Sequence, residues 1–262
     1  MKITSIGQNK NKIMKNKLSL LITISSLTVF IACTIERPKP KVPDPFSYVT
    51  NKEGYKYKAV RIGSQTWMAE NLQSLRCVTK AGYKKQEKDS IRTLLPAEKN
   101  LQFYSDTNKY DPFVLQWTYN GVDSNKINFG RLYTYYAAVD TRKICPSGWH
   151  VPTAQEWEKM INYLGGDSIA GSKLKGNSPF LWNASLLQNS SNSTLFNAQG
   201  GGQKNEYGNF INQFNYGYWW TSTPDQDDSE QAIAYTLHVG SKRISQVSKS
   251  KKCALSVRCI LD

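Results

Sequence analysis

Two groups of neighbouring side chains in this sequence have the chemistry of a ligand-binding site. Trp219 and Trp220 form an aromatic pair, and aromatic faces can stack on the apolar face of a pyranose ring. Asp225, Asp227 and Asp228 follow shortly afterwards, and carboxylate oxygens are ligands that hard cations such as calcium prefer. These five residues are the candidate ligand-binding residues of the chain.

Both groups also have a structural interpretation. Adjacent residues of a strand point to opposite sides, so at most one of the two tryptophans is expected to be exposed. For both rings a wholly structural role, in a hydrophobic core, is the favoured interpretation. The acidic residues could form a solvated turn, and we assign no metal site to them.

The sequence offers no catalytic constellation. Its two histidines, His150 and His238, have no Ser, Cys or Asp partner at a recognisable spacing, which a general base would need. We interpret both histidines as structural. The prediction is a non-enzymatic protein without a cofactor.

The N-terminal residues have the pattern of an exported lipoprotein. Lys15 and Lys17 precede an apolar run over residues 18–32, which ends in Ala32-Cys33. This run is shorter than the roughly 20 residues that span a bilayer as a helix. The pattern resembles a bacterial lipobox, so residues 1–33 are predicted to be a lipoprotein signal peptide with Cys33 as the acylated, palmitate-bearing residue. The alternative is a soluble protein with a buried N-terminal helix.

A tether and a single domain are expected to follow. Residues 34–47 are rich in Pro and Lys, which favours a semi-rigid extended linker before a domain over residues 48–262. We therefore predict an outer-membrane lipoprotein, anchored by its lipid and displayed at the cell surface. The formal charge is +14, of which residues 34–262 carry +9, because five lysines and no acidic residue fall within residues 1–33. No nucleic-acid-binding motif accompanies this charge, so we exclude a nucleic-acid partner.

Four cysteines remain after Cys33. An even number in an exported chain indicates two disulfides, and four cysteines allow three connectivities. The chain has neither CxxC spacing nor enough histidines for a zinc site. These cysteines are Cys77, Cys145, Cys253 and Cys259.

One helix is strongly indicated. Thr153 and Glu156 have the spacing of a capping box, and Gly165-Gly166 supplies a stop. An apolar stripe between them recurs at Trp157, Met160, Ile161 and Leu164.

The remaining pattern is that of an α+β domain. A similar stripe at Leu132, Tyr135, Tyr136 and Val139 predicts a second short helix. Long irregular regions are expected over Val78–Lys126 and Gly165–Gly217. Antiparallel strands are predicted over Tyr55–Ile62, Ala232–Val239, Arg243–Val247 and Ala254–Leu261.

Several motifs together resemble the Fibrobacter succinogenes major paralogous domain. The resemblance covers roughly residues 50–262 and implies an exported lipoprotein or surface protein whose biochemical role is generally unassigned. The motifs, in chain order, are Ile62–Leu72, Gly130–Tyr133, Cys145–Trp157, Ala170–Lys175, Tyr218–Thr223 and Ser256–Cys259.

A wider resemblance implies a C-type-lectin-like fold. Val151–Glu158 is similar to the "LPTEAEWE" helix of formylglycine-generating enzymes, and Val257-Arg258-Cys259 is similar to their final "FRC" run. A disulfide between Cys145 and Cys259 is implied by lectin-like folds, which leaves Cys77 to pair with Cys253. The copper-binding cysteine pair of those enzymes and the calcium–sugar motifs of true C-type lectins have no counterpart here.

Two functions follow from this reading. The first is a binding or adhesion module for a glycan or protein ligand at the cell surface. The alternative is a degenerate relative of the formylglycine-generating oxidoreductases. Because the sequence offers no acid–base or metal constellation, we favour the binding module.

Overall fold

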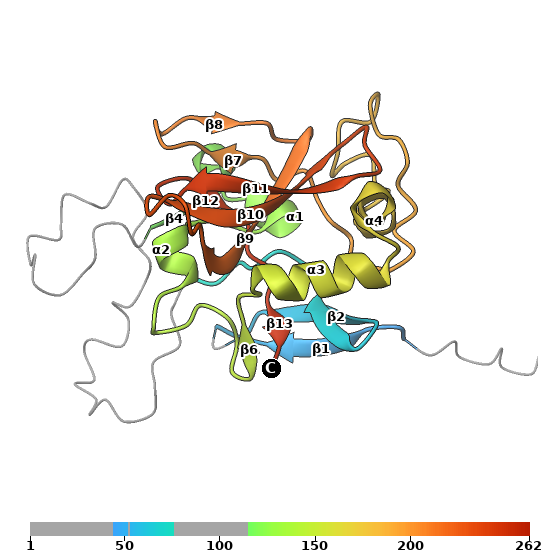
Figure 1. The fold of residues 1–262 in the computed structure, drawn as a ribbon, viewed down its shortest axis with the longest axis horizontal. Helices are drawn as coiled ribbons and strands as arrows, with labels where there is room; N and C mark the ends of the chain where they lie inside the picture. The colour runs from blue at the N-terminus through green and yellow to red at the C-terminus, as the bar shows by residue number, and fades with distance from the viewer. Residues whose placement is uncertain (1–43, 52, 76–114) are drawn as a thin grey trace, which may run out of the picture. The chain divides into compact units, whose positions relative to one another are not determined.

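Helix α3 (Ala154–Tyr163) lies between two antiparallel sheets and organises the fold (Figure 1). The structure is a computed structural model that describes residues 44–51, 53–75 and 115–262. Short helices and antiparallel sheets together make an α+β domain, as predicted.

The first sheet joins the two ends of the described chain. Its strand order is β1-β2-β3-β13-β6, so the C-terminal strand lies between N-terminal and central segments. Ile260 is opposite both Trp67 and His150 in the ladders. The strands are β1 (Ser47–Thr50), β2 (Lys56–Ile62), β3 (Gln65–Met68), β6 (Trp149–His150) and β13 (Ile260–Leu261).

The second sheet contains the longest strands. Its order is β11-β10-β9, and β10 pairs with both neighbours over most of its length. The strands are β9 (Tyr216–Pro224), β10 (Gln231–His238) and β11 (Ile244–Ser250).

The third sheet consists of two- and three-residue strands in the order β4-β5-β12-β7-β8. The strands are β4 (Gln116–Trp117), β5 (Leu132–Thr134), β7 (Gln203–Lys204), β8 (Phe210–Ile211) and β12 (Ala254–Leu255). The remaining helical segments are the 3-10 turn η2 (Tyr119–Gly121), α1 (Asn125–Phe129), α2 (Tyr135–Ala138) and α4 (Asp167–Leu174).

Local chemistry explains where α3 begins and ends. The Thr153 side chain accepts a hydrogen bond from the Glu156 amide, and Glu156 accepts one from the Thr153 amide at 2.8 Å, which confirms the capping box. Gly165 and Gly166 then take φ values of 98° and 96°, which glycine adopts without strain.

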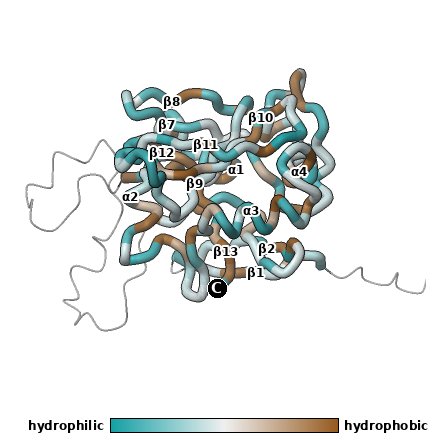
Figure 2. The backbone as a smooth tube through the Cα atoms, in the orientation of Figure 1, coloured by the Kyte–Doolittle hydropathy of each residue, from teal (hydrophilic) through white to brown (hydrophobic). Residues whose placement is uncertain are grey.

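The apolar face of α3 forms the centre of the core. Trp157 is fully buried, and its ring lies 5.0 Å from those of Trp67 on β3 and Tyr235 on β10. It therefore joins the first sheet to the second. Hydrophobic stretches of the chain lie where α3 meets the strands, and the tip of the β7–β8 hairpin is hydrophilic (Figure 2).

Several predicted elements differ from the structure. The helix predicted from Leu132 is only the single turn α2, because Leu132 lies in β5, where it pairs with Trp117. The region 165–217 is not wholly loop, since it contains α4, β7 and β8. The strand expected over 254–261 is divided into β12 and β13, and residues 115–126 contain β4 and η2.

The predicted lipid anchor falls outside the part of the chain that the structure describes. Cys33, Cys77 and the whole of residues 1–33, the predicted signal peptide, lie outside the described residues. Among residues 44–51, 53–75 and 115–262, no helix is both long and apolar enough to cross a bilayer.

Candidate functional site

Polar residues from distant motifs meet in a buried network around Asn71. The side-chain oxygen of Asn71 accepts hydrogen bonds from Nε of Arg258 at 3.0 Å and from Nε1 of Trp219 at 2.9 Å. Its amide nitrogen donates to the carbonyl oxygen of Phe129 at 2.8 Å. The motif residues thus satisfy one another inside the protein, and their role in the fold is structural.

Arg258 is a buried cation within this network. Its guanidinium donates to the carbonyl oxygens of Phe196 and Asn197, and it lies 4.1 Å from the centre of the Phe196 ring. Burial lowers the pKa of Arg258, while the charge of Glu70 opposes that shift. Neutral oxygens therefore hold this guanidinium, which ties the last segment of the chain to the 196–197 loop.

Trp219 and Trp220 are not a ligand platform. They point to opposite sides of β9, as strand geometry requires, but both side chains are fully buried. Trp219 packs beside Trp157 of α3, whereas Trp220 donates to the carbonyl oxygen of Tyr133 at 2.8 Å and packs against Tyr135. The prediction of an exposed aromatic platform here is wrong, because β9 is covered on both sides at these positions.

The acidic residues close the connection between β9 and β10. The Asp225 carboxylate accepts hydrogen bonds from the Asp227 amide at 2.9 Å and from the Ser248 hydroxyl. Asp228 accepts from the Glu230 amide at 2.9 Å. The bond from Ser248, with that from Asp227, lowers the pKa of Asp225. A bond from the Gln231 side-chain amide at 2.8 Å, with that from Glu230, lowers the pKa of Asp228.

These contacts are those of a hydrogen-bonded surface turn. Over the described residues no group of three or more His, Cys, Asp or Glu side chains is placed to hold a metal ion. The Asp225–Asp228 turn is held by its own hydrogen bonds, and ligand binding by these residues stays a prediction.

A pocket lies between the end of α2, strand β6 and strand β9. Its volume is about 300 Å³. The walls combine apolar side chains with a rim of polar ones. The lining residues are Ala138, Val139, Asp140, Thr141, Lys143, Ile144, Cys145, Trp149, His150, Val151 and Ser222.

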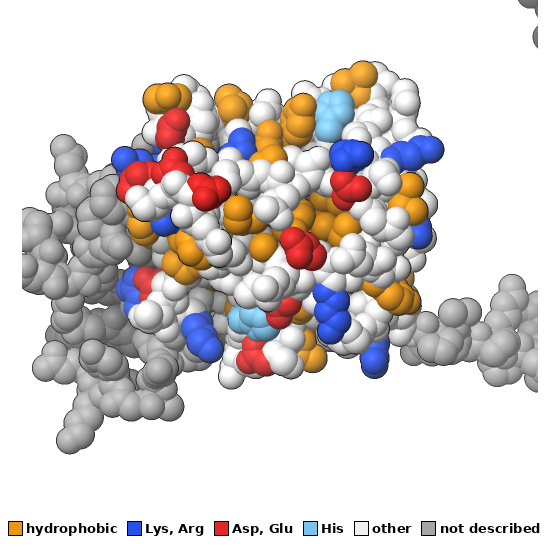
Figure 3. Space-filling model, in the orientation of Figure 1, with side chains coloured by type: hydrophobic (Ala, Val, Ile, Leu, Met, Phe, Trp, Pro, Cys, Tyr) orange, Lys and Arg blue, Asp and Glu red, His pale blue; other side chains and the backbone are white. Residues whose placement is uncertain are grey.

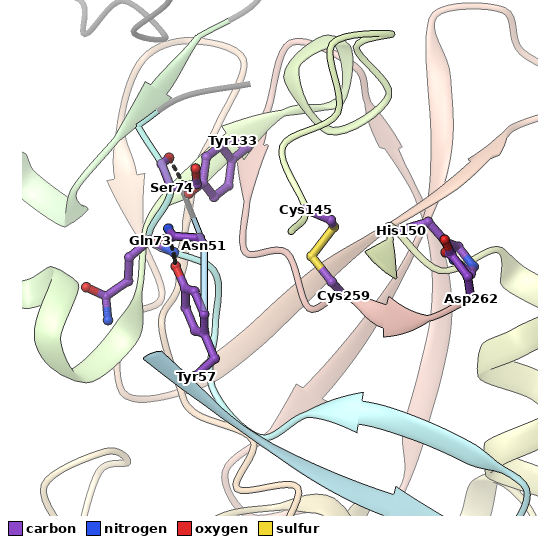
Figure 4. Close-up of a disulfide and its surroundings, with 9 residues drawn as sticks. All are labelled: Asn51, Tyr57, Gln73, Ser74, Tyr133, Cys145, His150, Cys259 and Asp262. Carbon is purple, nitrogen blue, oxygen red and sulfur yellow. Dashed lines mark hydrogen bonds and ion pairs between the residues drawn. A yellow bond between two sulfur atoms is a disulfide. The ribbon is translucent and has the colours of Figure 1, made fainter. Parts of the chain in front are cut away.

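The Cys145–Cys259 disulfide supports one wall of this pocket. It joins the loop before β6 to the segment before β13, as predicted, and it lies close to the His150–Asp262 pair in Figure 4. Cys253 is a buried thiol, and burial raises its pKa. The predicted partner of Cys253, Cys77, lies outside the described residues, so that second pairing stays a prediction.

His150 on the pocket rim lies between two carboxylates. Its Nδ1 atom is 2.6 Å from an oxygen of Asp262, and its Nε2 atom is 2.9 Å from an oxygen of Glu156. Burial alone would lower the pKa of His150, but the hydrogen bonds to Asp262 and Glu156 outweigh it and raise the pKa. Because each ring nitrogen faces an acceptor, the imidazolium is the form that satisfies both contacts.

A second ion pair holds Asp140, another residue of the pocket lining. The Asp140 carboxylate receives two hydrogen bonds from the Arg142 guanidinium, at 2.8 Å and 2.6 Å. Burial would raise the pKa of Asp140, yet the bonds from Arg142 lower it overall. Two polar residues of the pocket lining, His150 and Asp140, are thus held in ion pairs.

Sequence reasoning missed this pocket for a simple reason. Its lining comes from segments that have no common pattern, and Ser222 lies 72 positions after His150. Glu156 lies in the same motif as His150, so that contact had a local signal. The contact between Asp262 and His150 had no local sequence signal, because the pairing of strands β6 and β13 brings these two residues together.

The thiol pair of formylglycine-generating enzymes is not found in this part of the chain. Of the three cysteines within the described ranges, Cys145 and Cys259 are joined to each other. The third, Cys253, is a single buried thiol.

Fold and site together define a disulfide-bonded α+β domain whose motif residues form a buried polar network, and the domain also has a small surface pocket. The chain belongs to the Fibrobacter succinogenes major domain family, whose sequence model matches residues 60–261. No curated protein and no solved structure matches the chain.

Proposed function

We propose that this protein is a lipid-anchored lipoprotein of the outer membrane that displays a non-enzymatic binding domain at the cell surface. The basic residues, apolar run and Ala32-Cys33 step support the anchor. The proline-rich residues 34–47 support a tether that holds the domain away from the lipid.

The pocket beside the disulfide is the observation that carries the binding function. A volume of about 300 Å³ is at the lower end of the range for ligand pockets, roughly 300–1,000 Å³. It would admit one sugar ring of a glycan or one side chain of a protein ligand. Trp149 and Val151 supply apolar surface, and Ser222 and Lys143 supply polar groups for orientation.

We also infer a C-type-lectin-like scaffold for this domain. The Cys145–Cys259 bond supports the inference, because it ties the segment before α3 to the end of the chain, as the resemblance implies. A fold of this kind leaves the ligand open, so the pocket and not the scaffold defines the function.

Filling the pocket tests the binding function. We would screen the full chain against a glycan array and a peptide library, with Thr141→Trp and Ser222→Phe as variants that occupy the pocket. Both variants should abolish binding at an unchanged melting temperature. Gln226→Trp, an exposed position in the β9–β10 connection, is the matched control and should bind normally. Full binding by both filled variants would exclude the pocket.

The anchor has a separate test. Cys33→Ala should leave an unprocessed or soluble species in a Triton X-114 partition, without palmitate labelling. If the variant is processed and partitions like the unaltered protein, the proposed lipidation is wrong.

A further inference from the structure

The sheet β11-β10-β9 has two different faces. One face carries Trp219, Tyr235 and Leu237 and packs on the core around α3. Strand geometry places Tyr216, Tyr218, Thr236 and His238 on the opposite face, where Tyr216 pairs with His238 and Tyr218 pairs with Thr236.

The end of this opposite face is an aromatic cluster that reaches the surface. The rings of Tyr216 and Tyr218 are nearly parallel, with centroids 5.7 Å apart. The His238 ring lies 4.7 Å from that of Tyr216. Tyr218 is buried, whereas Tyr216 and His238 are only half-buried, so their rings present accessible aromatic surface.

Hydrogen-bonding groups surround the aromatic cluster. Asn212 donates to the Tyr218 hydroxyl at 3.1 Å. Thr236 donates to the carbonyl oxygen of Gly217 at 3.1 Å, which leaves its oxygen able to accept. Ser245 lies beside Thr236 in the ladder and is also half-buried. Amide and hydroxyl groups beside aromatic rings are suited to the hydroxyls of a sugar.

The charged residues of β11 and of the segments on either side of it are all basic, and the Asp225 carboxylate borders the strand through its hydrogen bond from Ser248. Residues 242–252 contain Lys242, Arg243, Lys249, Lys251 and Lys252 and no acidic residue. Arg243 is paired with Asp167, and Lys251 donates to the carbonyl oxygen of Ser229.

Lys249 is the cation placed on the aromatic cluster. Its Nζ atom lies 4.8 Å from the centre of the Tyr218 ring. It forms no ion pair with another residue in the described ranges. Lys249 is the one charged residue within β11 itself. The visible face of the molecule mixes acidic and basic side chains (Figure 3).

We propose that the face formed by Tyr216, Tyr218, Thr236, His238 and Lys249, here the Tyr216 face, binds an acidic saccharide. A pyranose ring would stack against Tyr216 and His238, and its hydroxyls would meet Thr236 and Ser245. A uronic carboxylate would pair with Lys249 as a charge-assisted hydrogen bond. The Tyr216 face shares no residue with the pocket lining, so it is a second site and stands independently of the proposed pocket function.

Calorimetric titration of the full chain with tetragalacturonate tests this site. The neutral galactose tetramer of equal length is the comparison ligand. We expect binding of the acidic tetramer, at least tenfold weaker binding of the neutral one, and loss of affinity when NaCl is raised to 0.5 M, since salt screens exposed charges.

Variants locate the binding. Lys249→Gln and Tyr216→Ala should each weaken tetragalacturonate binding at least tenfold. If Tyr216→Ala lowers the melting temperature, the result for Lys249→Gln alone decides the test. Lys159→Gln and Tyr163→Ala, on the exposed side of α3, are matched controls and should bind normally. Thr141→Trp should also bind normally, which separates this site from the pocket.

Three outcomes would overturn the proposal. One is the absence of tetragalacturonate binding. Another is equal affinity for the neutral tetramer. The third is an equal loss of affinity for tetragalacturonate in Lys249→Gln and Lys159→Gln, because the loss would then follow from the net charge of the protein and not from the position of Lys249.

Discussion

The side-chain oxygen of Asn71 accepts a hydrogen bond from Nε of Arg258 at 3.0 Å, although the two residues are 187 positions apart in the chain. Asn71 follows β3 and Arg258 precedes β13, and these strands pair through Trp67 and Ile260. Trp219 donates to the same oxygen. One side-chain amide therefore connects three motifs of the family.

Removal of this amide should be strongly destabilising. Asn71→Ala leaves Nε of the buried Arg258 and the Trp219 indole without their shared acceptor, so we expect a loss of about 1–3 kcal/mol in the free energy of unfolding. Chemical denaturation measures it. Asn209→Ala, an exposed asparagine in the β7–β8 hairpin, is the control and should change stability by less than about 0.5 kcal/mol. A similar small change in Asn71→Ala would mean that the network contributes little.

Two substitutions in α3 should separate packing from capping. Trp157→Ala should cost roughly 3–5 kcal/mol, because it removes a fully buried ring and leaves a cavity. Thr153→Ala should cost only about 1 kcal/mol, since it removes one helix cap. Thermal unfolding of both variants measures the two stability losses, and that of Trp157→Ala should be the larger. Equal losses would contradict the central position of Trp157.

The disulfide should contribute much of the stability. Cys145 and Cys259 are 114 residues apart, and in the chain-entropy model closing a loop of that size contributes about 4–5 kcal/mol. Cys145→Ser with Cys259→Ser should lower stability by up to that amount in denaturant unfolding.

Peptide mapping without reduction would test the connectivity. It should recover the Cys145–Cys259 peptide, together with the predicted Cys77–Cys253 peptide. A Cys77–Cys145 peptide would exclude this connectivity.

His150 should make stability depend on pH. Its pKa is higher in the folded protein than in the unfolded chain, because Glu156 and Asp262 hold the imidazolium. The folded state therefore binds the proton more tightly. The stabilisation is fully present below the unfolded pKa, about 6.5, and is lost as the pH rises through the raised folded pKa.

Unfolding free energies measured between pH 5.5 and 8.5 would show this dependence. His150→Gln should flatten the profile over that range. An unchanged slope in His150→Gln would show that the two carboxylates do not stabilise the imidazolium.

Elements whose signals are local could be predicted from the sequence. The capping box, the apolar stripe and the terminal glycines of α3 all lie within fourteen consecutive residues, 153–166, and each acts within a turn or two of helix. Strands β10 and β11 were also found, because alternation and an intervening turn are short-range patterns. Helix α4 was missed because its Gly and Ser residues give no clear apolar stripe, and its packing against β11 positions it instead.

Family membership was determined by the sequence alone, because ordered motifs identify a chain whether or not their roles are known. The site was decided only by the tertiary structure. Burial depends on what covers a strand, so Trp219 and Trp220 became core residues while Tyr216 on the same strand stayed accessible. The contact between His150 and Asp262 arises because β13 pairs with β6, and no local pattern encodes a pairing across 112 positions.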